Sequence, residues 1–130
     1  MAGELEAVVR GMFDALDKND VEAVRRTGAD DMQGIDEISR HWMRGPGEVR
    51  QYIGQMMSMI EDVRSEVNDV HEILWGDTGL ATFWLEQDYT LEGKRQHISA
   101  PTTVVLRRQD GEWRLVLFHS LPLPEEKPAD

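Results

Sequence analysis

The sequence of 130 residues contains no cysteine. This absence excludes disulfide bonds, thiolate metal sites and a cysteine nucleophile, and it is typical of proteins in a reducing compartment. No apolar run approaches the roughly 20 residues that a membrane-spanning helix needs. The first residues also lack the basic start and apolar stretch of a signal peptide. We therefore predict a cytoplasmic protein with no membrane partner.

Basic residues are scarce. Lysine and arginine number 14 against 25 aspartates and glutamates, so the net charge is −11. A surface this acidic repels the phosphates of nucleic acids and of anionic lipids, and we expect neither as a partner. The four histidines do not follow the spacing of a metal-binding motif. We predict neither a metal site nor a cofactor.

The sequence has no internal repeat and no linker. Its length fits one domain, and its 40% hydrophobic content is enough for an ordinary core. Prolines and acidic residues gather at the end of the chain, where they oppose continuation of a sheet. We predict a single domain over residues 1–121 and a proline-rich, acidic tail over residues 122–130.

Three segments of the N-terminal half show the spacing of amphipathic helices. Apolar residues recur every three or four positions over residues 4–17, and again over residues 49–60 after the Gly45-Pro46-Gly47 break. Between them, Asn19 or Asp20 can cap a shorter helix that Gly28 ends. The intervening residues 29–44 alternate loosely, which indicates a short strand with irregular edges.

The C-terminal half changes to the pattern of β-strands. Segments 67–75, 80–91, 95–108 and 112–121 are rich in β-branched and aromatic residues, and glycine-containing turns separate them. The Asp110-Gly111 pair is the strongest hairpin signal, because this dipeptide tolerates the positive φ angles of a type I′ turn. Helices followed by an antiparallel meander predict an α+β fold, with the helices on one sheet face.

Two-residue turns would pair Trp113 with Arg108, His119 with Thr102, and Thr102 with Phe83. A turn over residues 76–79 would pair Glu72 with Phe83. Alternation then places the side chains of His119, Thr102 and Phe83 on one aliphatic surface, which we assign to the helix side. A single bulge would invert part of this sorting.

The second surface, which includes Trp84, is also too apolar for water. Helices can cover only one face of the sheet well, so we expect the other face to pack against a second copy of the chain. The predicted assembly is a homodimer formed through a sheet face.

The segment from Asp110 to Ser120 reads DGEWRLVLFHS. It resembles the closing hairpin of SnoaL-like domains, which belong to the nuclear transport factor 2-like superfamily. The segments NDVEAV at residues 19–24 and WMRG at residues 42–45 are similar to the family's entries into its second and third helices. The resemblance covers nearly the whole chain.

This resemblance implies a cone-shaped, cystatin-like α+β fold in which three N-terminal helices pack on a curved antiparallel sheet around a pocket. The superfamily includes ketosteroid isomerases, polyketide cyclases, scytalone dehydratase and epoxide hydrolases. It also includes non-catalytic transport and oligomerisation domains, so the fold does not select a function.

The resemblance places Asp36 about where ketosteroid isomerases keep their general base. The tyrosine that such isomerases carry on the first helix is replaced by Met12, so half of the expected oxyanion stabiliser is missing. Gln87 and Asp88 are the alternative candidates for the missing donor. The alternative is that Asp36 is a solvated carboxylate at a strand edge.

His119 is a second catalytic candidate, because an imidazole in a narrow pocket can shuttle protons near neutral pH. It can equally be a core histidine that Thr102 or a backbone carbonyl satisfies. Asp88 opposite His97 fits either an acid–base pair or an ordinary cross-strand pair.

The expected walls of a ligand pocket are aromatic, methionine and threonine side chains, although the same residues also suit an ordinary core. They are Trp42, Tyr52, Met56, Phe83, Trp84 and Thr102. We expect an apolar ligand, polycyclic or carbonyl-bearing, with isomerase, cyclase or dehydratase chemistry through Asp36 and His119. The alternative is a non-catalytic ligand-binding, dimerisation or scaffolding domain.

Overall fold

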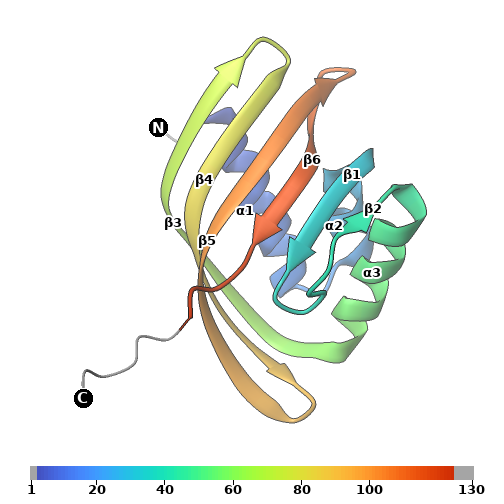
Figure 1. Cartoon of the computed structure of the whole chain (residues 1–130), viewed down its shortest axis with the longest axis vertical. Helices are drawn as coiled ribbons and strands as arrows, with labels where there is room; N and C mark the ends of the chain where they lie inside the picture. Colours follow the sequence, from blue (N-terminus) through green and yellow to red (C-terminus); the bar gives the residue numbers. More distant parts are fainter. Residues whose placement is uncertain (1–2, 125–130) are drawn as a thin grey trace.

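A computed structural model describes residues 3–124, apart from the side chain of Pro46. These residues form three helices and six strands (Figure 1). The helices are α1 (Glu4–Asp17), α2 (Val21–Thr27) and α3 (Pro46–Met59), and the strands are β1 (Gly28–Asp36), β2 (Met43–Arg44), β3 (Ile60–Trp75), β4 (Thr78–Leu91), β5 (Lys94–Gln109) and β6 (Glu112–Ser120). The predicted α+β fold class is confirmed.

Helix α1 packs on the sheet through the apolar stripe that its sequence predicts. Leu5, Val9 and Phe13 on this stripe are buried. No side chain caps the helix from the preceding residue. Instead, the carboxylate of Glu72 on β3 accepts a hydrogen bond from the backbone N–H of Glu6 at 2.8 Å. A negative charge at the helix N-terminus is favourable, so this contact helps to hold α1 against the sheet.

Local signals mark the ends of the other two helices. Asp20, rather than Asn19, caps α2, because its side chain accepts a hydrogen bond from the N–H of Ala23 at 3.2 Å. Gly45 precedes α3 with a φ angle of +90°, a conformation that glycine adopts without strain. Helix α3 then turns its own apolar residues, Val49, Ile53, Met56 and Met57, into the core.

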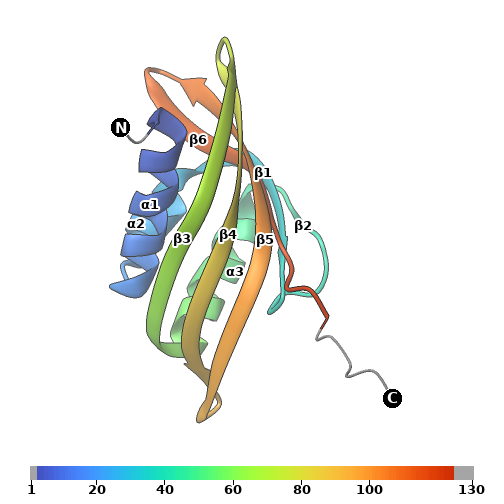
Figure 2. The same ribbon diagram turned by 90° about the vertical axis from the view of Figure 1, so that its left-hand side faces the viewer.

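The sheet has the strand order β2-β1-β6-β5-β4-β3. Strands β3 to β6 form the predicted antiparallel meander. The sequence did not predict that β1 would pair in parallel with β6 and extend the sheet. The sheet bends, and α1 and α2 lie on one side of it (Figure 2). We call the helix-covered face concave and the opposite face convex.

Several predicted strand registers are confirmed. Trp113 pairs with Arg108, and Thr102 pairs with Phe83. The first hairpin is shifted by two residues: Glu72 pairs with Ala81, not with Phe83. The reason is that β4 begins at Thr78, two residues before the predicted start, so Trp75 pairs with Thr78 across a two-residue turn. A shift by two keeps each side chain on its predicted face.

The predicted pairing of His119 with Thr102 is wrong. Val105 pairs with Leu117 and Leu106 pairs with Leu115, so Val116 is an extra residue on β6. This bulge shifts the rest of the strand by one position. His119 therefore pairs with Thr103, and Ser120 takes the place beside Thr102. His119 lies on the convex face, opposite to the predicted one.

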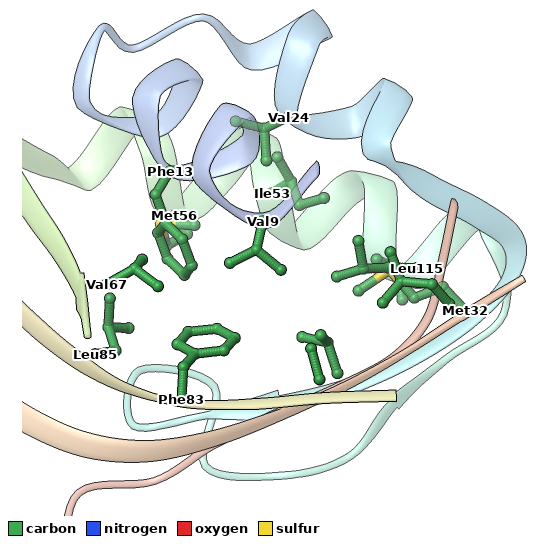
Figure 3. Close-up of a cluster of buried hydrophobic side chains, with 14 of the residues drawn as sticks. Val9, Phe13, Val24, Met32, Ile53, Met56, Val67, Phe83, Leu85 and Leu115 are labelled. Atoms are coloured by element: carbon green, nitrogen blue, oxygen red, sulfur yellow. The ribbon is translucent and has the colours of Figure 1, made fainter. Parts of the chain in front are cut away.

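The core fills the space between the helices and the concave face of the sheet. Figure 3 shows Phe13 and Met56 pointing from the helices toward Phe83, Leu85 and Val67 on the strands. The rings of Phe13 and Phe83 meet edge to face with centroids 6.1 Å apart. Large aromatic and methionine side chains from both layers therefore converge around one interior region.

The end of the chain is described only as far as residue 124. Residues 122–124 have no regular secondary structure, and the rest of the predicted proline-rich tail, residues 125–130, lies outside the described residues. Within residues 3–124, none of the helices combines the length and the apolar character needed to cross a bilayer.

Candidate functional site

An apolar cavity lies between the helices and the concave face. It leaves about 90 Å³ for the centres of water-sized molecules. One water needs only about 10–15 Å³ on this measure, so the cavity can hold several waters or a small ligand. Methionines, aromatic rings and aliphatic side chains from α1, α3 and the sheet form most of the wall, and the polar exceptions are Asp36, Glu37, Tyr52, Gln87 and Ser120.

Asp36 stands at the end of β1, where the chain turns sharply. One oxygen of its carboxylate accepts hydrogen bonds from the backbone N–H groups of Ile38 at 3.0 Å and Ser39 at 2.8 Å. The hydroxyl of Tyr52 on α3 donates to the two carboxylate oxygens at 2.8 and 3.0 Å. The turn and the tyrosine together fix the carboxylate at the cavity wall, so Asp36 is not the exposed strand-edge group of the alternative interpretation.

The sequence prediction missed two titratable groups of the site, Glu37 and its hydrogen-bond donor Tyr89. Burial, and to a smaller extent the negative charge of Asp36, raise the pKa of the Glu37 carboxyl from 4.5 to about 7. The hydroxyl of Tyr89 on β4 donates to its Oε1 at 3.3 Å. A carboxyl with a pKa near neutrality can both give and take a proton at physiological pH.

The sequence prediction missed Glu37 because it treated this segment as a strand, in which neighbouring residues such as Asp36 and Glu37 point to opposite faces. The strand ends at Asp36, however, and the next residues form a turn. Both residues therefore line the same cavity. The signal in the sequence was the pair of adjacent acidic residues in a segment with irregular alternation.

The two tyrosines act as hydrogen-bond donors to these carboxyl groups. Burial is the main cause that raises the pKa of Tyr52, and the charge of Asp36 adds to it. Burial and the charge of Glu37 raise the pKa of Tyr89 in the same way. Both phenols therefore keep their protons throughout the physiological range, and the site is a cluster of two carboxyl groups and two neutral phenols.

Gln87 lies at another part of the wall and is held by a chain of hydrogen bonds. Its Nε2 donates to the hydroxyl of Ser65 at 3.0 Å, and that hydroxyl donates to the carboxylate of Asp17 at 2.7 Å. The backbone N–H of Ser65 also donates to Asp17 at 3.0 Å. Because Ser65 gives its single proton to Asp17, it can only accept from Gln87, which fixes the orientation of the amide.

Three of the predicted site residues, Asp36, Tyr52 and Met56, line the cavity. Phe83 and Thr102 are buried on the concave face but do not contribute to the wall. Trp42, Trp84 and His119 lie outside the cavity. The structure thus brings the predicted base together with one aromatic and one methionine of the predicted wall, and it separates them from the predicted histidine and both tryptophans.

His119 packs at the convex face against Trp42, with ring centroids 5.9 Å apart. The predicted pair of Asp88 and His97 also forms, with Nδ1 of His97 2.7 Å from the carboxylate of Asp88. The hydrogen bond to Asp88 raises the pKa of His97. Neither histidine lines the cavity, so neither belongs to its chemistry.

No three histidine, cysteine, aspartate or glutamate side chains of residues 3–124 gather as they would around a metal ion. The cavity also lacks an arginine or lysine in its described wall. The polar groups available in the wall are two carboxyl groups, the phenol of Tyr52, an amide and a hydroxyl.

Comparison with known proteins matches the SnoaL-like domain to residues 5–124. The chain belongs to the SnoaL-like family. Its structural neighbours include NTF2-like proteins and proteins with a cystatin-like fold, and together with the family match they confirm the predicted superfamily and fold. A comparison with curated proteins finds no match.

Three solved structures illustrate how this SnoaL-like fold recurs. A candidate calcium/calmodulin-dependent protein kinase II association domain from Xanthomonas campestris has a TM-score of 0.82 at 20% identity, covering 95% of this chain and 88% of that one. A candidate NTF2-like dehydratase from Streptomyces avermitilis has a TM-score of 0.79 at 20% identity, covering 92% and 94%. A candidate aromatic ring hydroxylase from Novosphingobium aromaticivorans has a TM-score of 0.84 at 14% identity, covering 93% and 87%. At these identities the likeness shows the fold alone.

Proposed function

We propose that this SnoaL-like protein binds an apolar small molecule in its cavity and moves protons on it without a cofactor. The observation that carries the proposal is the placement of Asp36 and Glu37 in one apolar cavity, with the pKa of Glu37 near 7. Two carboxyl groups in different environments suit the roles of acid and base. Isomerisation, cyclisation and dehydration all need such a pair.

Among these reactions, elimination of water uses both groups most directly. Protonated Glu37 gives its proton to the leaving hydroxyl as the C–O bond breaks, and the bonding electrons leave with the oxygen. Asp36 takes a proton from the adjacent carbon, and the C–H electrons form the new double bond. Solvent then returns a proton to Glu37 and removes one from Asp36, which completes the cycle.

The fold contributes weaker support. One structural neighbour is a candidate dehydratase, although its 20% identity is too low to transfer an activity.

The lack of cysteine agrees with a reducing compartment, so we extend the proposal to a reaction in the cytoplasm.

The test uses 4-hydroxy-4-phenylbutan-2-one, an aromatic alcohol whose dehydration produces a conjugated enone that ultraviolet absorbance detects. We expect turnover by the wild-type protein. Glu37→Gln should lower the rate by about 10²–10⁴-fold, because the amide cannot give or take the proton. Glu66→Gln, at an exposed position on β3, is the matched control and should leave the rate unchanged.

Two results would count against acid–base catalysis. One is an unchanged rate in Glu37→Gln, and the other is the absence of turnover by a wild-type protein that binds the compound. The second result would favour a non-catalytic binding protein.

A second candidate function, dimerisation, rests on the convex face. Trp42, Trp84, Ile73 and Trp75 are large apolar side chains of this part of the molecule, and all are more than a third exposed. All strands except the short β2 are about 30–50 Å long, and at about 4.8 Å spacing they give this face an area on the order of 1,000 Å². That area exceeds the about 800 Å² per partner of a standard interface.

We therefore propose that the convex face packs against a second copy of the chain. Trp84→Glu should convert the dimer into a monomer, because it places a charge at the centre of an apolar interface. Met59→Glu, at an exposed position at the end of α3, should leave the dimer intact. Sedimentation equilibrium separates the two masses, and a wild-type protein with the mass of one chain would contradict the proposal.

A further inference from the structure

The polar groups of the cavity share one property that can select a ligand. Most of their hydrogens are already donated to other groups of the protein. Tyr52 donates its hydroxyl hydrogen to Asp36. Tyr89, which does not line the cavity, donates its own to Glu37. Neither phenol has a second hydrogen to offer to a ligand.

Ser120 follows the same rule. The hydroxyl of Thr102 donates to the backbone carbonyl of Ala100 at 3.1 Å. The hydroxyls of Thr102 and Ser120 lie 2.8 Å apart. Since the single proton of Thr102 is used, Ser120 donates to Thr102, and its hydroxyl remains available to a ligand only as an acceptor.

Gln87 adds another acceptor. The chain through Ser65 and Asp17 commits one hydrogen of its Nε2 to the protein. Its Oε1 has no hydrogen-bond partner among the described residues. The amide therefore offers a ligand its carbonyl oxygen as an acceptor and the second hydrogen of Nε2 as its one remaining donor.

The carboxyl groups extend the pattern at pH 8, because Glu37, with a pKa of about 7, has lost its proton there and can only accept. Asp36 receives hydrogen bonds mainly at one oxygen, which leaves lone pairs on the other. The described wall contains no lysine, arginine or histidine to attract an anion. An anionic ligand would meet two carboxyl groups in an apolar space with no compensating charge.

We propose that the cavity is specific for uncharged, hydroxylated aromatic compounds that donate hydrogen bonds to its wall, and that it discriminates against carboxylates and against ligands with acceptors only. This inference rests on the proposed function, because it names the substrate class of the same cavity. It departs from the carbonyl-bearing ligand that the sequence suggested. The physical reason is that a carbonyl needs a donor, and most donors of this wall are already used.

The experiment measures binding of three matched naphthalenes at pH 8: 2-naphthol, 2-methoxynaphthalene and 2-naphthoate. The naphthol differs from the ether chiefly by its donor hydrogen, and the naphthoate adds a negative charge. The readout is the spectrum of ¹³C-methyl methionine, because Met12, Met32, Met43 and Met56 line the cavity. Met59, exposed at the end of α3, is an internal control that should not shift.

We expect naphthol to bind about tenfold more tightly than the methyl ether, since one net hydrogen bond is worth about that factor. Naphthoate should produce no shift at the same concentrations. Gln87→Leu should reduce the preference for naphthol over the ether, whereas Gln51→Leu, exposed on α3, should preserve it. The ligand series with wild-type protein decides the question even if Gln87→Leu fails to fold.

The outcomes separate the two proposals. Equal binding of naphthol and its ether, or tighter binding of naphthoate, overturns the inference about donors and leaves the ligand cavity in place. No shift of any cavity methionine with any of the three compounds contradicts the ligand cavity itself, and the inference fails with it.

Discussion

At the scale of single residues, the central feature is the contrast between two neighbouring acids. Asp36 is held by backbone N–H groups and by Tyr52, whereas the hydroxyl of Tyr89 donates a long hydrogen bond to Glu37. Burial, with few hydrogen bonds to offset it, raises the pKa of the Glu37 carboxyl to about 7. The difference comes from one turn, which aims its N–H groups at Asp36.

Glu37 predicts a pH dependence of stability. The pKa of its carboxyl is about 7 in the folded protein, against 4.5 for an exposed glutamate. The folded state therefore binds more protons between these values, and stability falls as the pH rises from about 4.5 through 7. The loss is of order 3 kcal/mol at about 1.4 kcal/mol per pKa unit.

Urea unfolding of wild type and Glu37→Gln at pH 5 and pH 8 measures this effect. The variant should be the more stable protein at pH 8, because the amide removes a buried charge. The difference between the two proteins should shrink toward pH 5. A Glu37→Gln protein that loses stability on going from pH 5 to pH 8 as steeply as the wild type would show that another group titrates.

At the scale of secondary-structure elements, the contact between α1 and β4 depends on a glycine. A Cβ atom on Gly79 would lie 2.5 Å from Cδ1 of Leu5, which is fully buried. The close approach lets the start of α1 pack directly on the sheet. A Cβ atom on Gly11, in the middle of the same helix, would meet no neighbouring atom within 4 Å.

These two glycines give opposite predictions for the same substitution. Gly79→Ala should destabilise the protein by about 1–3 kcal/mol, because the new methyl group forces the fully buried Leu5 to shift within a packed core. Gly11→Ala should stabilise it by about 0.5–1 kcal/mol, because alanine favours a helix interior. Thermal and urea unfolding of both variants measure the difference. Equal effects would mean that α1 is not tightly packed on β4.

At the scale of the whole molecule, net charge opposes the proposed dimer. Each chain carries a net charge of −11, so two copies repel each other at long range while their apolar faces attract. The apolar attraction comes from Trp84 and the other exposed apolar side chains of the convex face. The expected interface is therefore held by apolar burial and weakened by overall repulsion.

This balance predicts that salt strengthens the dimer. Raising the ionic strength from about 20 to about 200 mM shortens the screening length from about 20 Å to below 10 Å and reduces the repulsion. The dimer dissociation constant should fall, as sedimentation at several protein concentrations can measure. A dimer that weakens with salt would indicate an interface of ion pairs instead.

The sequence predicted correctly those features that depend on interactions between residues close together in the chain. Helix α1 began and ended where its apolar period predicted, and Asp20 capped α2 through a contact three residues away. The turn at Asp110-Gly111 set the start of the last hairpin correctly. All of these features depend on neighbours in the chain, so their signals are local.

The tertiary structure alone decided the composition of the cavity. The bulge at Val116 places His119 on the convex face, and the turn after Asp36 places Glu37 in the cavity wall. Pairing of β1 with β6 and the packing of α3 brought Tyr52 to Asp36. Local sequence determined the elements, because backbone hydrogen bonds and apolar periodicity act over a few residues. The faces on which single side chains lie depended on bulges and on partners distant in the chain, which no local pattern records.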